Sequence, residues 1–215
     1  MPVSLNQILE MPNAAILAEQ IQTALEREKA EREHFYKIID ENKKMEFING
    51  EIFFQSPVKI EHNQATKRIC ILLNTFVDTH DLGFVGIEKI LISLTRNDYE
   101  PDVCFFGKAK SEKFKAGQMQ FPAPDLAVEV LSDSTEKHDR ETKFADYAAH
   151  GVTEYWIVDA KKEVVEQYVL PNDRYELLVK SGNGEIESVV LENFKIPIRA
   201  IFDKQTNLET LKSLI

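Results

Sequence analysis

Two carboxylates lie inside otherwise apolar segments of this 215-residue chain, and they are the side chains best suited to chemistry. Asp102 lies in EPDVCFF and Glu129 in LAVEVL. Burying a carboxylate is costly unless a cation or hydrogen-bond donors meet it. If the two segments are neighbouring strands, both carboxylates can bind one Mg²⁺ ion, with Mn²⁺ as the alternative, since Mg²⁺ takes one or two carboxylates and keeps several waters. The other interpretation is structural, because buried carboxylates also cap turns and pair with arginines.

Three further charged residues and one histidine are candidates to support such a metal site. Lys143 lies on the helix expected after the Glu129 strand, and an ammonium there would orient a water or stabilise charge on a phosphate. Arg140 lies one turn before Lys143, so we expect both on nearly the same face. His62 opens another helix, either facing solvent or contacting phosphate. Glu46 begins a strand and is a candidate supporting acid.

Other catalytic classes are disfavoured by the sequence. Ser132 and Ser134 lack a partnered histidine and a Gly-x-Ser-x-Gly turn, which argues against a serine hydrolase. No glycine-rich phosphate loop is present, which disfavours an NTPase or dinucleotide enzyme. The net charge of −10 argues against non-specific coating of nucleic acid, but not against a local patch. Four lysines at 108, 110, 113 and 115 form either a solvated loop or such a patch, which we expect to border the cleft.

The segment from residue 121 to 160 must position the chemistry. It predicts a strand at Leu126–Leu131, a helix at Asp139–Ala149 and a strand at Glu154–Asp159. A strand, a helix and a strand in so few residues form a crossover, so the two strands should be parallel. We also expect Tyr99–Phe106 to be a strand beside Leu126–Leu131, because only then can Asp102 and Glu129 share a cation.

The rest of the chain predicts an α/β protein. Asn49-Gly50 between two apolar runs predicts a type I′ hairpin over Met45–Phe54. Further elements are expected as helices at Asn13–His34, Glu61–Thr79 and Leu208–Ile215, one or two strands in Gly83–Leu94, and a C-terminal antiparallel meander at Val164–Leu170, Tyr175–Val179 and Ile186–Leu191. We expect residues 1–34 to be an N-terminal helical extension and residues 35–215 to be the main domain. The extension has an apolar stripe, which suggests a homodimer.

Composition favours a cytoplasmic protein without a membrane anchor. Apolar residues make up 43 % of the chain, enough for a substantial core, and no apolar run approaches 18 residues. The N-terminus lacks the features of a signal peptide. Cys70 and Cys104 each have apolar neighbours, which indicates buried, reduced thiols.

Four sequence blocks resemble the Uma2 family of endonucleases, within the PD-(D/E)XK nuclease superfamily. They are NGEI at residues 49–52, SPV at 56–58 followed by His62, EPD at 100–102, and the long block from Glu129 to Asp159. The resemblance covers roughly residues 35–170 and leaves the N-terminal helix outside. It implies a restriction-endonuclease-like fold: a mixed central sheet flanked by helices, here with a C-terminal antiparallel meander and an N-terminal helix.

The resemblance also implies a function, metal-dependent hydrolysis of phosphodiester bonds in DNA. Asp102 and Glu129 would be the Mg²⁺ ligands. The superfamily expects a lysine two residues after the acid, where this chain has Leu131, and Lys143 on the following helix is the candidate replacement. The alternative is a catalytically silent nucleic-acid-binding or protein-interaction module on the same fold, which the acidic charge and Leu131 favour.

Overall fold

The segment expected to organise the chain forms the middle of a six-stranded sheet. The structure, a computed structural model, describes residues 4–40 and 42–214. β8 (Leu126–Val130) and β9 (Glu154–Asp159) are parallel neighbours, and α5 (Lys143–Ala149) lies in the connection between them. A π-helical turn, His138–Thr142, precedes α5. The predicted crossover is therefore confirmed, with a wider first turn than a regular helix has.

The six-stranded sheet is mixed, and its order is β11-β10-β9-β8-β6-β3. Besides β8 and β9 it contains β3 (Gly83–Ile87), β6 (Val103–Gly107), β10 (Val164–Val169) and β11 (Glu176–Ser181). Only the β8–β9 pair is parallel; the other four pairs are antiparallel. β6 and β8 are neighbours with Val103 opposite Val128, which confirms the expected adjacency of the strands that carry the two carboxylates.

A second sheet packs beside the first, in the order β2-β1-β5-β4-β7. Its strands are β1 (Met45–Ile48), β2 (Glu51–Phe54), β4 (Leu91–Ser93), β5 (Asp98–Tyr99) and β7 (Gln120–Phe121). The hairpin of β1 and β2 turns at Asn49 and Gly50, whose φ angles are 52° and 87°. Both angles are positive, as a type I′ turn requires, so the predicted hairpin is confirmed.

The expected single strand at Tyr99–Phe106 is wrong, because the chain passes from one sheet to the other within it. β5 ends at Tyr99 in the second sheet, and β6 begins at Val103 in the first. Pro101 has no N–H for a sheet hydrogen bond, and the N–H of Glu100 donates to the side chain of Glu46 instead. This crossing leaves Asp102 immediately before β6, where the strand enters the central sheet between β3 and β8.

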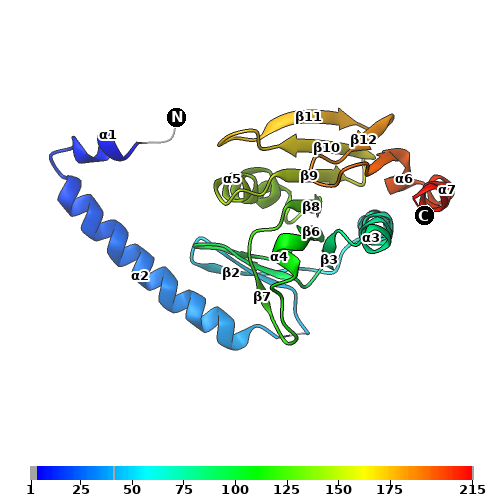
Figure 1. Ribbon diagram of the computed structural model, residues 1–215. Helices are drawn as coiled ribbons and strands as arrows, with labels where there is room; N and C mark the ends of the chain where they lie inside the picture. The colour runs from blue at the N-terminus through cyan, green and yellow to red at the C-terminus, as the bar shows by residue number, and fades with distance from the viewer. Residues whose placement is uncertain (1–3, 41, 215) are drawn as a thin grey trace.

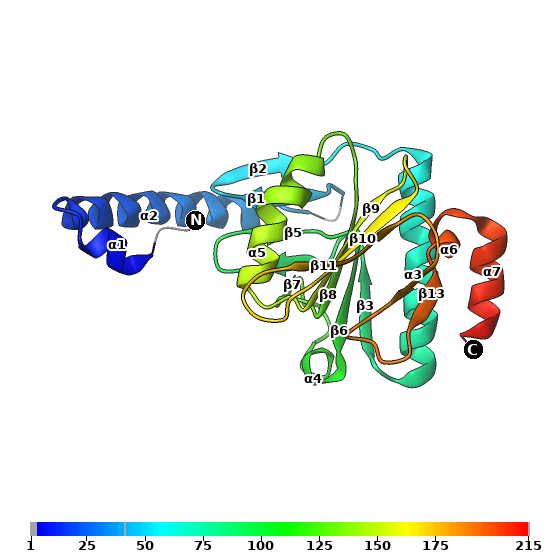
Figure 2. The ribbon, with the colours of Figure 1, turned by 90° about the horizontal axis from the view of Figure 1, so that it is seen from above.

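Strand alternation decides which face each side chain joins. α3 (Ile60–His80), α6 (Arg199–Phe202) and α7 (Lys204–Ser213) cover one face of the central sheet, and α5 covers the other (Figure 2). Val128 and Val130 belong to the core under α3, whereas Ala127 belongs to the core under α5. Glu129 is two residues after Ala127 on the same strand, so the two side chains lie on the same face and Glu129 is directed towards α5.

The C-terminal part agrees with the predicted meander for two of three strands. β10 and β11 extend one edge of the central sheet. The third strand instead forms a separate antiparallel pair, β12 (Glu185–Glu187) with β13 (Lys195–Pro197). The final helix begins at Lys204 rather than at Leu208, and Ile215 lies outside the described residues.

The N-terminal part is a long helix that projects from the body (Figures 1 and 2). A short α1 (Leu5–Leu9) precedes α2 (Ala14–Ile38), which is longer than the predicted helix and is not capped by the side chain of Asn13. Near the C-terminal end of α2, Arg32 binds Asp98 with a distance of 2.6 Å between Nε and Oδ2. Among the described residues, no helix is long and apolar enough to cross a membrane.

Candidate metal and catalytic site

Asp102 and Glu129 border the same small polar cavity. Asp102 lies immediately before β6, Glu129 lies on the adjacent β8, and the two residues are only 4 % and 3 % exposed. The N–H of Val130 donates to Asp102 Oδ2 at 2.8 Å, so this carboxylate takes the place of a strand partner at the end of β8. The cavity has a volume of about 10 Å³, which is room for about one water-sized body.

Two basic side chains hold Asp102 in its charged form. Lys44 Nζ lies 3.0 Å from Oδ1, and His62 Nε2 lies 3.3 Å from Oδ2. Burial alone would raise the pKa of Asp102, but the hydrogen bond from His62 and the charge of Lys44 outweigh it and hold this pKa below its usual value. His62 is buried, so the solvent-facing interpretation of this residue is wrong.

Lys143 is fully buried among three carboxylates. Its Nζ lies 2.9 Å from Glu46 Oε1, 3.0 Å from Glu129 Oε1 and 3.1 Å from Asp139 Oδ1. Burial lowers the pKa of Lys143, but Glu129, Glu46 and Asp139 overcome that effect and raise it well above the usual value. The ammonium therefore stays charged, and the structure brings Glu46 and Lys143 together as the sequence suggested.

Negative charge exceeds positive charge around Glu129. Burial, the largest cause, raises the pKa of this carboxyl well above its usual value; Lys143 opposes the rise, while Asp139 and Asp102 add to it. Burial likewise raises the pKa of Asp139, whose Oδ1 forms no hydrogen bond although it lies near Lys143. One lysine does not neutralise this group of acids, which is the electrostatic condition that favours a further cation.

The donor set fits a hard divalent cation held by two carboxylates. Glu129 Oε1 accepts hydrogen bonds from Lys143 and from the hydroxyl of Tyr147, at 3.0 and 3.1 Å. No described residue donates a hydrogen bond to Oε2, which leaves that oxygen for a ligand. Among the described residues, no three or more His, Cys, Asp or Glu side chains are arranged so that they could hold a metal ion by themselves. Carboxylates from Asp102 and Glu129, completed by water and substrate, match Mg²⁺ better than metals that need a full protein cage.

Arg140 does not join the site, contrary to expectation. Its guanidinium binds Glu166 on β10 with two hydrogen bonds of 3.0 and 3.2 Å, and it also binds Glu136. The sequence argument assumed a regular helix between Arg140 and Lys143. The π turn widens the spiral there, so the two side chains leave the helix in different directions.

The lysine-rich loop also lies away from the site. Lys108 follows the last residue of β6, whereas Asp102 precedes the first, so the two are at opposite ends of that strand. Lys108 pairs with Asp81 and Lys110 with Asp125. The loop contains α4 (Lys108–Ser111) and β7, so it is partly ordered secondary structure and does not border the cleft.

Three contributors were missed by the sequence interpretation. Lys44 stands just before β1 and gave no local signal, because it reaches Asp102 only through the pairing of distant strands. Asp139 precedes Lys143 by four residues, a spacing that allows an ion pair along a helix, although the sequence interpretation gave Asp139 no role. Tyr147 lies on the expected helix Asp139–Ala149 without a predicted role in the site, but its hydroxyl donates a hydrogen bond to Glu129.

The fold of this chain is shared with a solved structure. The structure resembles the crystal structure of a "putative nuclease belonging to DUF820" from Anabaena variabilis, with a TM-score of 0.68 and 16 % identity. The match covers 82 % of this chain and 96 % of the other. At this level of identity, the likeness establishes the fold.

The family is established by the sequence. The model of the Uma2 family, described as "Putative restriction endonuclease", matches residues 32–199, and the chain belongs to this family. Two relatives come from Synechocystis sp. and are called "Uncharacterized protein sll1609" and "Uncharacterized protein slr1290". The first is 32 % identical over 67 % of this chain and 83 % of its own length. The second is 29 % identical over 70 % of this chain and 80 % of its own length.

Proposed function

We propose that this protein is a metal-dependent endonuclease that hydrolyses phosphodiester bonds in DNA. Its family and its fold support a nuclease. The observation that carries the proposal is the convergence of Asp102, Glu129 and Lys143 on one polar cavity. These three residues come from two strands and a helix, and a purely structural ion pair would not require a cavity between them.

In this proposal Asp102 and Glu129 hold Mg²⁺ or Mn²⁺. Such an ion, when bound, polarises a phosphate oxygen and lowers the pKa of a bound water. Lys44 and His62 keep Asp102 ionised and fix the orientation of its carboxylate. Lys143 supplies positive charge beside Glu129 and stabilises the charge that develops on the phosphate. Glu46 and Asp139 hold the Lys143 ammonium in place.

A second candidate function follows from the same lysine. Lys143 already neutralises part of the charge of Glu129, as a metal ion would, and the position two residues after Glu129 holds the apolar Leu131. Both observations favour a catalytically silent nucleic-acid-binding or protein-interaction module. Metal-dependent cleavage is the property that separates the two candidates.

The test is a cleavage assay with purified protein on supercoiled plasmid, single-stranded DNA and RNA. Each substrate is incubated with Mg²⁺, with Mn²⁺ or with EDTA. We expect cleavage of DNA that needs the metal and is lost in Glu129→Gln, which keeps the shape of the side chain and removes its charge. Glu187→Gln, an exposed glutamate on β12, is the matched control. Cleavage that survives in Glu129→Gln, or no cleavage by the parent protein, would contradict the proposal.

We further propose a cytoplasmic homodimer. The cytoplasmic placement is supported by Cys70 and Cys104, which both carry free thiols. The dimer is supported by α2, where Ile16, Ile21 and Leu25 are exposed to 59 %, 50 % and 42 %. The segment LEREKAERE on the same helix carries both signs of charge, so an antiparallel copy of the helix can pair with it.

A further inference from the structure

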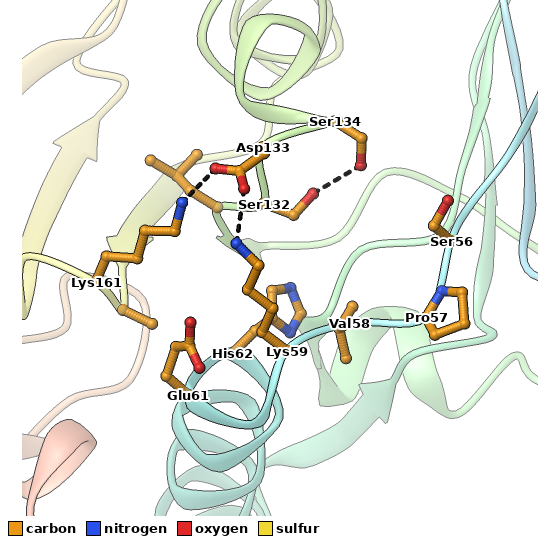
Figure 3. Close-up of a pocket in the computed structure, with 12 residues that line it drawn as sticks. Ser56, Pro57, Val58, Lys59, Glu61, His62, Ser132, Asp133, Ser134 and Lys161 are labelled. Carbon is orange, nitrogen blue, oxygen red and sulfur yellow. Dashed lines mark hydrogen bonds and ion pairs between the residues drawn. The ribbon is translucent and has the colours of Figure 1, made fainter.

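A larger cavity adjoins the candidate catalytic cavity. Its volume is about 190 Å³, and the two cavities share five lining residues, which are Ser56, Val58, His62, Ser132 and Ser134 (Figure 3). The larger cavity has an apolar part, formed by Pro57, Val58, Leu131 and Ala160, and a charged part, formed by Lys59, Glu61, Asp133 and Lys161. A group bound here would therefore lie directly beside the proposed reaction centre, in a space that suits a flat or apolar body.

Two lysines from different elements stand at this cavity and share one carboxylate. Lys59 precedes α3, and Lys161 follows β9. Lys59 Nζ lies 2.8 Å from Asp133 Oδ2, and Lys161 binds Asp133 Oδ1 (Figure 3). Hydrogen bonds and charge from Lys161 and Lys59 lower the pKa of Asp133 to about 2. Asp133 is therefore an anion throughout the neutral range.

The Asp133 carboxylate occupies a place that suits a phosphate. It presents two anionic oxygens, each bound by one ammonium, as a phosphodiester group would. The Asp133 side chain is 66 % exposed, and the two lysine side chains are 57 % and 52 % exposed. Exposed ion pairs contribute little to stability, so an incoming phosphate can displace the carboxylate at small cost.

We propose that the larger cavity binds the nucleotide next to the scissile phosphate, with Lys59 and Lys161 binding the flanking phosphate. In the free protein Asp133 takes the place of that phosphate and acts as an internal competitor. The apolar walls receive the sugar and base. This inference rests on the proposed nuclease function, and it gives a chain of net charge −10 a local cationic contact beside the reaction centre.

The first test measures binding of a fluorescein-labelled single-stranded DNA by anisotropy, in EDTA and over a range of salt concentrations. For single-stranded DNA, the slope of the logarithm of the binding constant against the logarithm of the salt concentration is about −0.7 for each phosphate that the protein neutralises. We expect Lys59→Gln/Lys161→Gln to weaken binding and to lower the magnitude of this slope by about 0.7, because the two lysines bind one phosphate. Asp133→Asn should strengthen binding about three- to fivefold, since the lost competitor is a weak exposed pair. Glu185→Gln, which removes the exposed partner of Lys195 elsewhere, is the control and should change neither.

The second test separates the apolar cavity from the charges. Ala160→Leu fills the larger cavity without changing any charge. It should weaken binding severalfold and leave the salt slope unchanged, and a melting curve verifies that the variant is folded. If the double lysine variant keeps the parent salt slope, or Asp133→Asn binds no more tightly than Glu185→Gln, the inference is wrong. A parent protein that does not bind the DNA would also overturn it.

The two proposals fail in different ways. If the parent protein cleaves DNA but the Lys59, Lys161 and Asp133 variants bind as the parent does, the nuclease function stands and the nucleotide cavity does not. If these variants change binding as expected but no metal supports cleavage, the cavity binds nucleic acid and the endonuclease proposal fails.

Discussion

Lys143 shows how one residue links stability to the proposed chemistry. Lysine is rarely fully buried unless its charge is paired, and here Glu46, Glu129 and Asp139 surround the ammonium within 3.1 Å. Because those carboxylates are buried as well, the lysine cannot be removed without leaving them uncompensated. Its role is therefore structural and, in the proposed mechanism, catalytic.

The first prediction concerns Lys143→Met, which keeps much of the stem and removes the charge. We expect the free energy of unfolding to fall by about 3–5 kcal/mol, the usual cost of breaking a buried ion pair from one side. Urea unfolding measures this loss. Cleavage per folded molecule should fall by about a hundredfold or more, as for the loss of a preorganised stabilising donor.

The matched control for this variant is Lys137→Met, an exposed lysine just before the π turn. It should change the free energy of unfolding by no more than about 0.5 kcal/mol. If Lys143→Met unfolds at the same urea concentration as this control and cleaves as well as the parent, Lys143 has neither role.

At the residue scale, the sequence predicted the carboxylates better than the cations. Asp102 and Glu129 were found because a charge inside an apolar segment needs a partner. Lys44, the ion-pair partner of Asp102, was not predicted. It lies just before β1, and only the tertiary fold brings it to Asp102. The prediction that Arg140 lies at the site was wrong because no sequence pattern indicated the π turn.

At the scale of elements, Glu154 joins β9 to the C-terminal part of the chain. The Oε1 atom of this buried carboxylate accepts hydrogen bonds from Trp156 Nε1 and Gln167 Nε2, at 2.6 and 2.7 Å. Its Oε2 atom accepts hydrogen bonds from Ser188 Oγ and the N–H of Val189, at 2.7 and 2.9 Å. The carboxylate therefore fixes the segment after β12 against the central sheet.

The second prediction is that Glu154→Ala lowers the free energy of unfolding by about 3 kcal/mol or more. Several buried donors lose their acceptor, and each unsatisfied group costs about 1–3 kcal/mol. Chemical denaturation measures the change, and Glu187→Ala, an exposed glutamate on the neighbouring β12, is the control. A loss of less than about 1 kcal/mol in Glu154→Ala would show that water replaces the carboxylate.

The third prediction concerns the lysine-rich loop after β6. Replacing lysines 108, 110, 113 and 115 with glutamine should leave DNA affinity and its salt slope close to the parent values. The reason is that the loop lies at the end of β6 opposite Asp102, and two of its lysines already pair with Asp81 and Asp125. The same anisotropy titration measures both quantities, with Lys59→Gln/Lys161→Gln for comparison. A drop in salt slope of about 1 or more would place the loop in the nucleic-acid interface.

Elements formed by local contacts were the ones that sequence could predict. The crossover of β8, α5 and β9 is contiguous, and the Asn49-Gly50 hairpin is a local turn, so both were found. The second sheet joins β1, β5, β4 and β7 across distant parts of the chain through short pairings. β5 and β7 have two residues each, too few for a recognisable alternation, and the transfer at Pro101 merged two strands into one prediction.

At the scale of the whole molecule, most of α2 is exposed and makes little contact with the rest of the protein. It extends beyond the body (Figure 1), and α1 and α2 expose Leu5, Leu9, Ile16, Ile21 and Leu25. The five exposed apolar side chains on these two helices favour an interaction site. The division of the chain at residues 34 and 35 stays a prediction, although the family match begins close to it, at residue 32.

The fourth prediction is that the protein is a dimer at micromolar concentration and that Ile21→Glu makes it a monomer. A charge in the centre of an apolar helix–helix contact is costly to bury. Light scattering coupled to size exclusion measures the mass. Leu208→Glu, which alters an exposed leucine on α7, is the control and should leave the dimer intact. A monomeric parent protein would remove the dimer from the account.

The most direct test of the account is whether Asp102 and Glu129 form one divalent-cation site. Thermal unfolding is followed with increasing MgCl₂ or MnCl₂ in the parent, in Asp102→Asn, in Glu129→Gln and in the exposed control Glu187→Gln. A ligand that binds the folded state stabilises it by about 2.7 kcal/mol at one hundred times its Kd, so the melting temperature of the parent and the control should rise with metal. Both site variants should lose that rise. A parent whose melting temperature does not respond to either metal, or variants that respond as the parent does, would contradict the account.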